Sequence, residues 1–402
     1  MATLPCWTST SIAGEYDVSY VDPVGQRSMV LDEHRNSFYH AALKSVITPD
    51  SVVMDLGAGL GVLGLMAAKL GAAKVYLIEP ATDLIVAKEL AVANGLQDNI
   101  VYIPKSVEQA GELEPVDVIV SVFTGNFLLE EDLLPSLLFA RDQYLRPGGS
   151  LIPNAGQMWA QPVTMQNYFD RQVGKWASDS NHIDHSEMSK YATNSLYYEQ
   201  FNQEHYEPVA DPLLLQSIDF YSASEAACRA KVKFMATHDA VVHGFLGWFD
   251  IELGKARLST APNSPSTHWS QVFLPAQKPF NVRHGDEIGF ELNRPERGEW
   301  SWRILADGET EQHSTFLSRP FSAVDLARRS ASYKPSVSVW GKVAIATLTA
   351  FGQGKTVARI ANDIRVGWPG LFPNEKTAIR FVQQQVDRFD RREFEGDETG
   401  HE

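Results

Sequence analysis

Apolar and polar positions follow two different patterns along this chain. Over the first 150 residues, short apolar runs of strand length are separated by segments of helix length. Two of these segments end in a glycine, Gly71 and Gly95, which is typical of a helix C-terminus. Strands that alternate with helices predict a parallel, doubly wound sheet. The expected strands are 51–56, 73–80, 99–105 and 116–123, and the expected helices are 63–71, 82–96 and 135–149, the last stopped by Pro147 and two glycines.

After residue 150 the pattern becomes alternating and rich in aromatic residues. Segments such as VVHGFLGWFDIEL (241–253) and EWSWRIL (299–305) are separated by turn sequences such as APNSPS (261–266). This pattern predicts an antiparallel barrel or sandwich, with its tryptophans in the core. A polar, aromatic, helix-like stretch at 164–205 interrupts it, and we expect an arm or a surface insertion there.

A third pattern begins near residue 335. A glycine-rich turn precedes a helix with Val357, Ile360 and Ile364 on one face, and a longer amphipathic helix spans 374–389. This segment has the general look of a small winged-helix unit, as found in peptide-recognition and DNA-binding domains, and a purely structural cap is the alternative. The sequence thus predicts a domain over 1–150, a second over 151–330, a winged-helix-like module over 335–392 and a disordered tail over 393–402.

Composition narrows the class of partner and compartment. The 402 residues carry a net charge of −15, so a nucleic acid backbone is an unfavourable partner. No apolar run is long enough to span a membrane, and the first residues lack the pattern of a signal peptide. Only Cys6 and Cys228 occur, so we expect a cytoplasmic protein without disulfides. The histidines of HIDH (182–185) have no accompanying ligand cluster, so no metal site is expected.

The first candidate site is the glycine-rich turn DLGAGLG (55–61) between a strand and a helix. Such a turn holds a ligand at the helix N-terminus, and nucleotide cofactors of several kinds use it. Asp55 precedes the turn, and Glu79 ends the next strand, where its carboxylate can accept both hydroxyls of a ribose. Nicotinamide enzymes carry the same acid, so Glu79 alone does not decide between a dinucleotide and another nucleotide cofactor.

DLGAGLG with the downstream IEP (78–80) resembles the first motifs of class I S-adenosylmethionine (SAM) methyltransferases. Further segments extend the likeness: MVLDEHRNSFY (29–39), VVHGFLGWFDIEL (241–253) and LSTAPNSPSTHWSQVF (258–273). With them, the whole stretch 16–315 resembles the protein arginine methyltransferases, in which a Rossmann-like SAM-binding domain is followed by a β-barrel carrying a dimerisation arm. The resemblance implies a homodimer, with 164–205 as the arm. It also implies that Arg35 grips the cofactor carboxylate, with Met29 near the sulfonium. The further cofactor-binding residues that it implies are Tyr20, Asp55, Gly57, Gly59, Glu79 and Glu108.

The acceptor pocket departs from the family pattern. The family's hairpin carries two glutamates; here SVFTGNFLLEED (121–132) keeps the second as Glu131 but has Val122 in place of the first. Two carboxylates clamp a guanidinium, and losing one charged partner of a buried group costs on the order of 3–5 kcal/mol. Either the acceptor is not an arginine, or Glu130 or Asp17 supplies the missing charge. Tyr16, near Asp17, is also expected in the pocket.

A neutral nitrogen needs only one carboxylate, so the first hypothesis is an N-methyltransferase acting on an imidazole or another side-chain nitrogen. The acceptor would be a peptide or an amino-acid-derived natural product. The resemblance pairs His268 of the Thr267-His268-Trp269 loop with Asp32, so Glu131, His268 and Asp32 are the expected catalytic residues, and Trp269 lines the pocket. The alternatives are a guanidine methyltransferase, for protein or free arginine, and a non-catalytic SAM-binding regulatory homologue.

Overall fold

The computed structural model describes residues 24–177, 179–180 and 182–390. Three residues named above, Tyr16, Asp17 and Tyr20, lie outside this part of the chain, as does the tail 393–402. The chain divides between Pro320 and Phe321 into two compact units, described separately below. Among the described helices, none is both long and apolar enough to cross a membrane.

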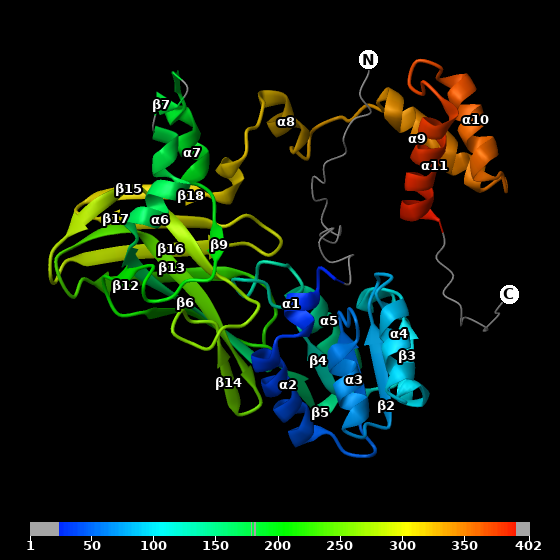
Figure 1. Cartoon of the computed structure of the whole chain (residues 1–402), viewed down its shortest axis with the longest axis horizontal. Coiled ribbons are helices and arrows are strands. Elements are labelled where there is room, and N and C mark those ends of the chain that lie inside the picture. The colour runs from blue at the N-terminus through cyan, green and yellow to red at the C-terminus, as the bar shows by residue number, and fades with distance from the viewer. Residues whose placement is uncertain (1–23, 178, 181, 391–402) are drawn as a thin grey trace. The chain divides into compact units, whose positions relative to one another are not determined.

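The first domain is built on a five-stranded parallel sheet in the order β3-β2-β1-β4-β5 (Figure 1). Strand β1 is buried over its whole length, which accounts for its uninterrupted apolar sequence. This arrangement agrees with the doubly wound sheet that the sequence predicts. The strands are β1 (Val52–Leu56), β2 (Lys74–Ile78), β3 (Ile100–Ile103), β4 (Val116–Ser121) and β5 (Leu145–Ile152).

Helices pack against this sheet and connect its strands. The chain enters through α1 (Arg27–Val30) and α2 (Glu33–Val46), which are separated at Leu31–Asp32 because the Asp32 side chain caps α2. The connecting helices are α3 (Val62–Lys69), α4 (Leu84–Ala93) and α5 (Leu134–Tyr144), with short 3-10 turns η2 (Gln97–Asn99) and η3 (Val107–Gln109).

One predicted boundary is wrong. The helix expected to continue to Pro147 ends at Tyr144, and the RPGG sequence lies inside strand β5. The pairing of β4 with β5 shifts register there, from Val116 opposite Leu145 to Val118 opposite Ser150. This irregularity accommodates Pro147 and the left-handed Gly148, which a regular strand would not hold.

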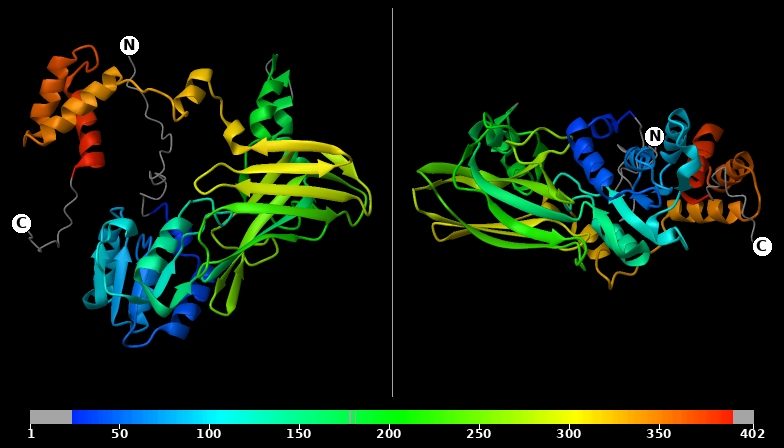
Figure 2. Two further views of the ribbon diagram at one scale, coloured as in Figure 1. Left: turned by 180° about the vertical axis from the view of Figure 1, so that it is seen from behind. Right: turned by 90° about the horizontal axis from the view of Figure 1, so that it is seen from below.

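The second domain consists of two antiparallel sheets that pack face to face, and we call it the barrel domain (Figure 2). Aromatic side chains fill the space between them: the rings of Phe245 and Phe290 stack at 4.2 Å, and Phe234 lies beside Phe245. Trp248, Trp269, Trp300 and Trp302 are all buried, as predicted. The first sheet contains β6 (Ala155–Thr164), β9 (Tyr197–Glu199), β10 (Glu207–Pro208), β11 (Leu213–Asp219), β13 (Ala240–Leu253), β14 (Ala256–Ser259) and β15 (Gln271–Val282); the second contains β12 (Cys228–Met235), β16 (Glu287–Arg294), β17 (Ser301–Ala306) and β18 (Glu309–Ser314).

The stretch 164–205 projects from one end of the barrel domain as an arm (Figures 1 and 2). Its base is anchored because Tyr168, Phe169 and Phe201 pack with Leu246 and Phe273 of the barrel in one buried cluster. The helix-like pattern of this stretch corresponds to α6 (Gln166–Gln172), η4 (Gly174–Ala177), η5 (Ser186–Met188) and α7 (Ser189–Ala192), with the short strands β7 (Asp179–Ser180) and β8 (Ile183–Asp184).

The C-terminal unit is helical in its described residues. Helices α9 (Val339–Phe351), α10 (Val357–Gly367) and α11 (Glu375–Phe389) enclose a small core that includes Ile360, Phe372 and Phe381. No strand occurs within residues 335–390, so the β-hairpin that defines a winged helix is absent from the described chain. Residues 322–337, which contain the short α8 (Ala323–Arg328), are exposed almost throughout, and η6 (Thr315–Ser318) precedes them.

Candidate active site

The candidate site lies where the order of the parallel strands reverses, between β1 and β4. Leu56, the last residue of β1, is paired in register with Ser121, the last residue of β4. The glycine-rich turn follows the first strand, and the hairpin with the three acids follows the second. Ligands of doubly wound sheets bind at such a switch point, beyond the carboxyl ends of the strands. The fold therefore brings the two sequence-predicted motifs to the same edge of the sheet.

The glycine-rich turn has the conformation that requires glycine. Gly57 and Gly59 have φ angles of 68° and 51°, in the left-handed region that L-residues avoid. The amide of Gly59 donates to the Glu79 carboxylate at 3.0 Å, and the amide of Ala81 donates to its other oxygen at 2.9 Å. Burial raises the pKa of Glu79. Each carboxylate oxygen keeps lone-pair capacity, so a ribose diol still fits this acceptor.

Asp55 supports the turn from beneath. Its side chain is 2% exposed and accepts a hydrogen bond of 2.7 Å from the amide of Gly64 in α3. Burial raises the pKa of Asp55 to about 7, against the opposing effect of this hydrogen bond. Asp55 thus holds the first turn of α3 against the end of β1.

Arg35 of α2 has an unused donor. Its guanidinium donates through Nε and Nη2 to the Asn36 side chain, at 3.0 and 2.7 Å. The third nitrogen, Nη1, is buried and has no hydrogen-bond partner among the described residues. An unsatisfied buried guanidinium donor is costly, and a carboxylate is the group that best satisfies it. The residues present therefore fit the amino acid end of SAM.

The sequence analysis does not identify Gln26 and Asp83, which meet beside the glycine-rich turn. Gln26, just before α1, is buried and donates to the Asp83 carboxylate at 2.7 Å. A Cβ placed on Gly59 would meet the Gln26 side chain at 3.2 Å, so Gln26 covers the glycine turn. A single glutamine in the polar stretch before α1 gives no sequence signal, because its burial depends on contacts with distant segments.

The other cofactor residues are more exposed. Met29 lies half-buried on α1, and Glu108 lies exposed on η3, where it accepts from the Ser136 hydroxyl at 2.7 Å. Among the described residues, neither side chain forms a hydrogen bond with Arg35.

Asp32 and His268 form the pair that the sequence analysis expects. Asp32 Oδ2 accepts from the His268 amide at 2.7 Å and pairs with its Nδ1 at 2.9 Å, while Asp32 Oδ1 caps α2. Burial raises the pKa of Asp32, but the hydrogen bonds from His268 and Arg35 outweigh it and bring the value to about 2. Burial lowers the pKa of His268, so the imidazole is neutral at pH 7 and donates from Nδ1. Its Nε2 then carries a lone pair.

The three acids of the hairpin serve different partners. Glu130 accepts from the Trp300 indole nitrogen at 2.5 Å, and Asp132 forms an ion pair with Arg294 at 2.8 Å. Glu131 between them is exposed, and Val122 at the start of the hairpin is half-buried. Because the Glu130 carboxylate is bonded to the barrel domain, we do not expect it to replace the missing first glutamate. Asp17 lies outside the described residues.

Trp269 docks the barrel loop onto this hairpin. Its side chain is 3% exposed, and its indole nitrogen donates to the Thr124 carbonyl at 2.8 Å. The adjacent Ser270 amide donates to the Asn126 side chain, also at 2.8 Å. Trp269 therefore lies at the boundary between hairpin and barrel, and its indole N–H already donates to the hairpin.

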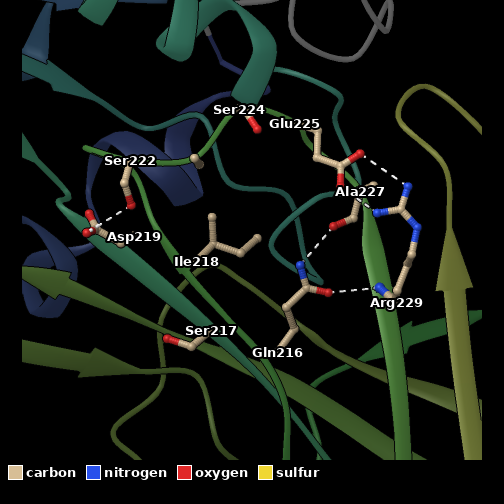
Figure 3. Close-up of a pocket in the computed structure, with 10 residues that line it drawn as sticks. Gln216, Ser217, Ile218, Asp219, Ser222, Ser224, Glu225, Ala227 and Arg229 are labelled. Carbon is tan, nitrogen blue, oxygen red and sulfur yellow. Dashed lines mark hydrogen bonds and ion pairs between the residues drawn. The ribbon is translucent and has the colours of Figure 1, made fainter.

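A separate pocket of about 300 Å³ opens between β11 and the start of β12 (Figure 3). Polar groups line it, including Asp219, Glu225 and Arg229, whose guanidinium pairs with Glu225. None of the predicted site residues lines this pocket. Within the described residues, no three His, Cys, Asp or Glu side chains cluster in a way that would hold a metal ion.

Two family models match the chain, one for each domain. Residues 40–154 match the ribosomal protein L11 methyltransferase (PrmA) model, and residues 154–300 match the arginine methyltransferase oligomerization subdomain. A solved structure of the Trypanosoma brucei PRMT1 enzyme–prozyme heterotetrameric complex with AdoHcy aligns with a TM-score of 0.69 and 27% identity, over 74% of this chain and 99% of that chain. Arabidopsis thaliana protein arginine methyltransferase 10 aligns with a TM-score of 0.64 and 26% identity, over 75% and 100%.

Curated relatives give the same result. Protein arginine N-methyltransferase 1.1 of Arabidopsis thaliana is 31% identical over 288 residues, which cover 69% of this chain and 73% of that protein. Protein arginine N-methyltransferase 2 of Dictyostelium discoideum is 33% identical over 248 residues, but the match spans only 48% of its length. The fold and these matches define a SAM-dependent methyltransferase. Within that class, the chain belongs to the protein arginine methyltransferase family.

Proposed function

We propose that this protein is an arginine N-methyltransferase that transfers the methyl group of SAM to a guanidinium nitrogen of a peptide or protein. The observation that carries the proposal is Glu131, an exposed carboxylate on the hairpin that follows β4, in a chain whose relatives are named for arginine methylation. A guanidinium donates in a planar fork, so one carboxylate can hold two of its N–H groups and leave the third nitrogen to react.

Bound SAM supplies a methyl group on a positively charged sulfur. Arg35 Nη1 would hold the cofactor carboxylate, and Glu79 would accept the ribose hydroxyls. Met29 and Glu108 would contact the sulfonium and adenine ends. We expect Arg35→Met to weaken SAM binding by about tenfold or more, because a charge-assisted hydrogen bond is worth roughly 1.5–3 kcal/mol. Isothermal titration calorimetry measures this, and unchanged affinity would remove Arg35 from the cofactor site.

The chain's own residues position the acceptor and take its proton. Glu131 orients the nitrogen for in-line displacement, in which the new N–C bond forms as the C–S bond breaks. The methylated nitrogen then releases a proton. Neutral His268, fixed through Nδ1 by Asp32, has the free Nε2 lone pair needed to accept it.

A second candidate acceptor is a neutral nitrogen such as imidazole, and Val122 favours it. With Glu130 bonded to Trp300, the described hairpin offers the acceptor one charge and an apolar wall. A guanidinium against that wall is less well compensated than a neutral ring, which one carboxylate suffices to orient. The acceptor would then belong to a peptide or an amino-acid-derived natural product.

The test is methyl transfer to a matched set of acceptors. Peptides that differ only in one central Arg, His or Lys, together with free arginine, are incubated with SAM and followed by mass spectrometry. We expect the Arg peptide to gain a methyl group and Val122→Glu to increase kcat/KM for that peptide. Methylation of the His peptide alone, with loss of activity in Val122→Glu, would replace the proposal by the second candidate.

We also propose a homodimer assembled through the arm. The match to the oligomerization subdomain covers the barrel domain and arm, and the heterotetramer noted above shows that a related chain assembles. Apolar side chains exposed on the arm of this chain include Trp176, Ile183 and Met188. These would be covered by a second copy.

A further inference from the structure

The acceptor hairpin is held by the barrel domain on both of its sides. Its first side is held by Trp269 and Ser270, which donate to Thr124 and Asn126. Its second side is held by different barrel residues: Trp300 donates to Glu130 at 2.5 Å, and Arg294 pairs with Asp132 at 2.8 Å.

The tip between these sides is buried. Phe127, Leu128 and Leu129 are 0%, 1% and 3% exposed, and the Phe127 ring lies 5.1 Å from the Trp300 ring. A Cβ on Gly247 of β13 would lie 2.9 Å from the Phe127 ring, so the tip is packed closely against the barrel sheet. The hairpin is therefore packed at its tip and hydrogen-bonded along both sides.

The residues on either side of Glu131 are both bonded to the barrel domain. The carboxylate of Glu130 faces Trp300, and burial raises its pKa. Asp132 adopts a left-handed φ of 55° and accepts from the Arg297 amide at 3.1 Å in addition to its pair with Arg294. A non-glycine residue keeps such a backbone angle only where its surroundings hold it.

We propose that Trp300 and Arg294 are positioning residues for Glu131. By fixing Glu130 and Asp132, they set the backbone between them and so direct the one pocket carboxylate toward the acceptor nitrogen. This rests on the proposed function for the role of Glu131, although the contacts themselves do not. Trp300 and Arg294 act from the barrel, 169 and 163 positions further along the chain than Glu131.

The close fit of Gly125 explains why positioning is sensitive here. A Cβ on Gly125 would lie 2.9 Å from both Glu130 Cβ and Glu131 Cγ. The opposite side of the hairpin thus limits how Glu131 can move, while the barrel fixes its neighbours. Misplacing a catalytic group by about 1 Å can cost about 10²-fold in rate. A loosened Glu130 or Asp132 would allow a displacement of that kind.

The main test compares Trp300→Phe with Trp302→Phe in the full chain. Both tryptophans are buried, and each donates one indole hydrogen bond, Trp300 to Glu130 and Trp302 to the Pro275 carbonyl. We expect Trp300→Phe to lower kcat by about 10–100-fold with little change in SAM affinity. Trp302→Phe should leave kcat within about threefold of wild type. Equal losses in both variants would reduce Trp300 to a packing residue and overturn the proposal.

A second measurement does not depend on activity. Amide hydrogen exchange over 122–134 should speed up in Trp300→Phe and remain unchanged in Trp302→Phe. If the wild-type enzyme methylates none of the acceptors offered, the proposed function fails. The exchange comparison still tests whether the Trp300 contact holds the hairpin. Unchanged exchange in Trp300→Phe would show that Trp300 does not hold the hairpin, and would overturn the proposal even if the enzyme is active.

Arg294 provides an independent variant. Arg294→Lys keeps the charge but loses the planar fork that pairs with Asp132, whereas Arg303→Lys makes the same change at an exposed pair with Glu291. We expect the first to lower kcat by about tenfold, and the second to have no effect. Effects of Trp300→Phe and Glu130→Leu on kcat should be non-additive, because each variant removes the hydrogen bond between the Trp300 indole and the Glu130 side chain. Additive effects would contradict action through Glu130.

Discussion

Glu131 differs from its two neighbours in having its side chain at the surface beside the switch point. We expect Glu131→Gln, which preserves shape and removes charge, to lower turnover by about 10²–10⁴-fold, the usual contribution of an orienting or basic carboxylate. SAM affinity should not change, since we propose that Glu131 holds the acceptor and not the cofactor. Steady-state kinetics with calorimetry measures both quantities. Glu112→Gln, at another exposed acid, is the control; a Glu131→Gln enzyme with full turnover would show that the hairpin does not serve the reaction.

Asp32 gives a pH dependence of stability with a defined sign. Its folded pKa of about 2 lies below the ordinary value of about 3.9, so the folded state favours the carboxylate. The Asp32 carboxylate thus adds about 2 kcal/mol at most to the free energy of unfolding. This contribution is complete above roughly pH 4 and is lost as the pH falls towards 2. His268, whose pKa is also lowered, adds a loss that begins below about pH 6.5. Both contributions therefore increase the free energy of unfolding as the pH rises.

The measurement is urea unfolding between about pH 7 and pH 3. Wild type should lose more stability than Asp32→Asn over this range, because the variant has no carboxylate to protonate. Asp211→Asn, at an exposed acid, should follow wild type. Parallel curves for wild type and Asp32→Asn would contradict the role given to this pair.

At the scale of elements, the arm joins a buried base to an exposed tip. Ile183 and Met188 are 57% and 38% exposed on the tip, whereas Tyr168 and Phe169 anchor the base. We expect Ile183→Glu with Met188→Glu to convert a dimer into monomers, because two charges would be buried in the apolar contact. Light scattering measures the mass. Met235→Glu on β12, which is 53% exposed, should leave the mass unchanged, and a dimeric double variant would exclude this surface from the interface.

The elements that the sequence predicts best are those whose burial is uniform. The strands of the parallel sheet are recognisable because apolar residues fill both faces, as in VVMDL of β1. The end of α5 is not recognisable from the sequence, because a proline and two glycines are typical of a helix end. In the structure these residues lie in β5, whose irregular pairing accommodates them. Helix α9 was not predicted because its residues VWGKVAIATLTAF are apolar on most sides, so no helical period is visible.

Prediction of the site was limited in a similar way. Glu131, His268 and Asp32 are identifiable because each lies in a local motif that resembles the family. The contacts of Glu130 and Asp132 could not be identified from the sequence. They depend on Trp300 and Arg294, which lie 170 and 162 positions away along the chain. Neither periodicity nor spacing contains that information, since it arises only when the barrel meets the hairpin.

Over the whole molecule, charge is divided unevenly between the two compact units. The larger unit, residues 16–320, contains 23 Lys or Arg and 39 Asp or Glu, a net charge of −16. The smaller unit, 1–15 with 321–402, contains 12 basic and 11 acidic residues, but its segment 321–390 alone has ten basic and five acidic residues, a net charge of +5. We expect the acidic larger unit to favour a cationic acceptor, and the basic segment 321–390 to favour an acidic segment of the same substrate. A peptide with an acidic segment apart from its methylated residue would gain affinity from both units through effective concentration.

We therefore expect removal of 338–402 to increase KM for such a peptide by about tenfold or more while leaving SAM affinity unchanged. KM for a short acceptor without the acidic segment should not change. Lys376→Glu with Arg380→Glu, on the exposed side of α11, should reproduce part of the effect in the full chain. A truncated enzyme with wild-type kinetics on both peptides would show that these helices do not recruit the acceptor.

The pairing of Leu56 with Ser121 means that the alignment of the reaction is carried by backbone hydrogen bonds. The donor turn and the acceptor hairpin are loops, yet each starts from a fixed rung of the same ladder. A slip of one residue between β1 and β4 would shift the loops by about 3.3 Å and turn every side chain to the opposite face. The buried faces of both strands prevent that slip. The register of β1 and β4 therefore fixes the position of the glycine-rich turn relative to the hairpin.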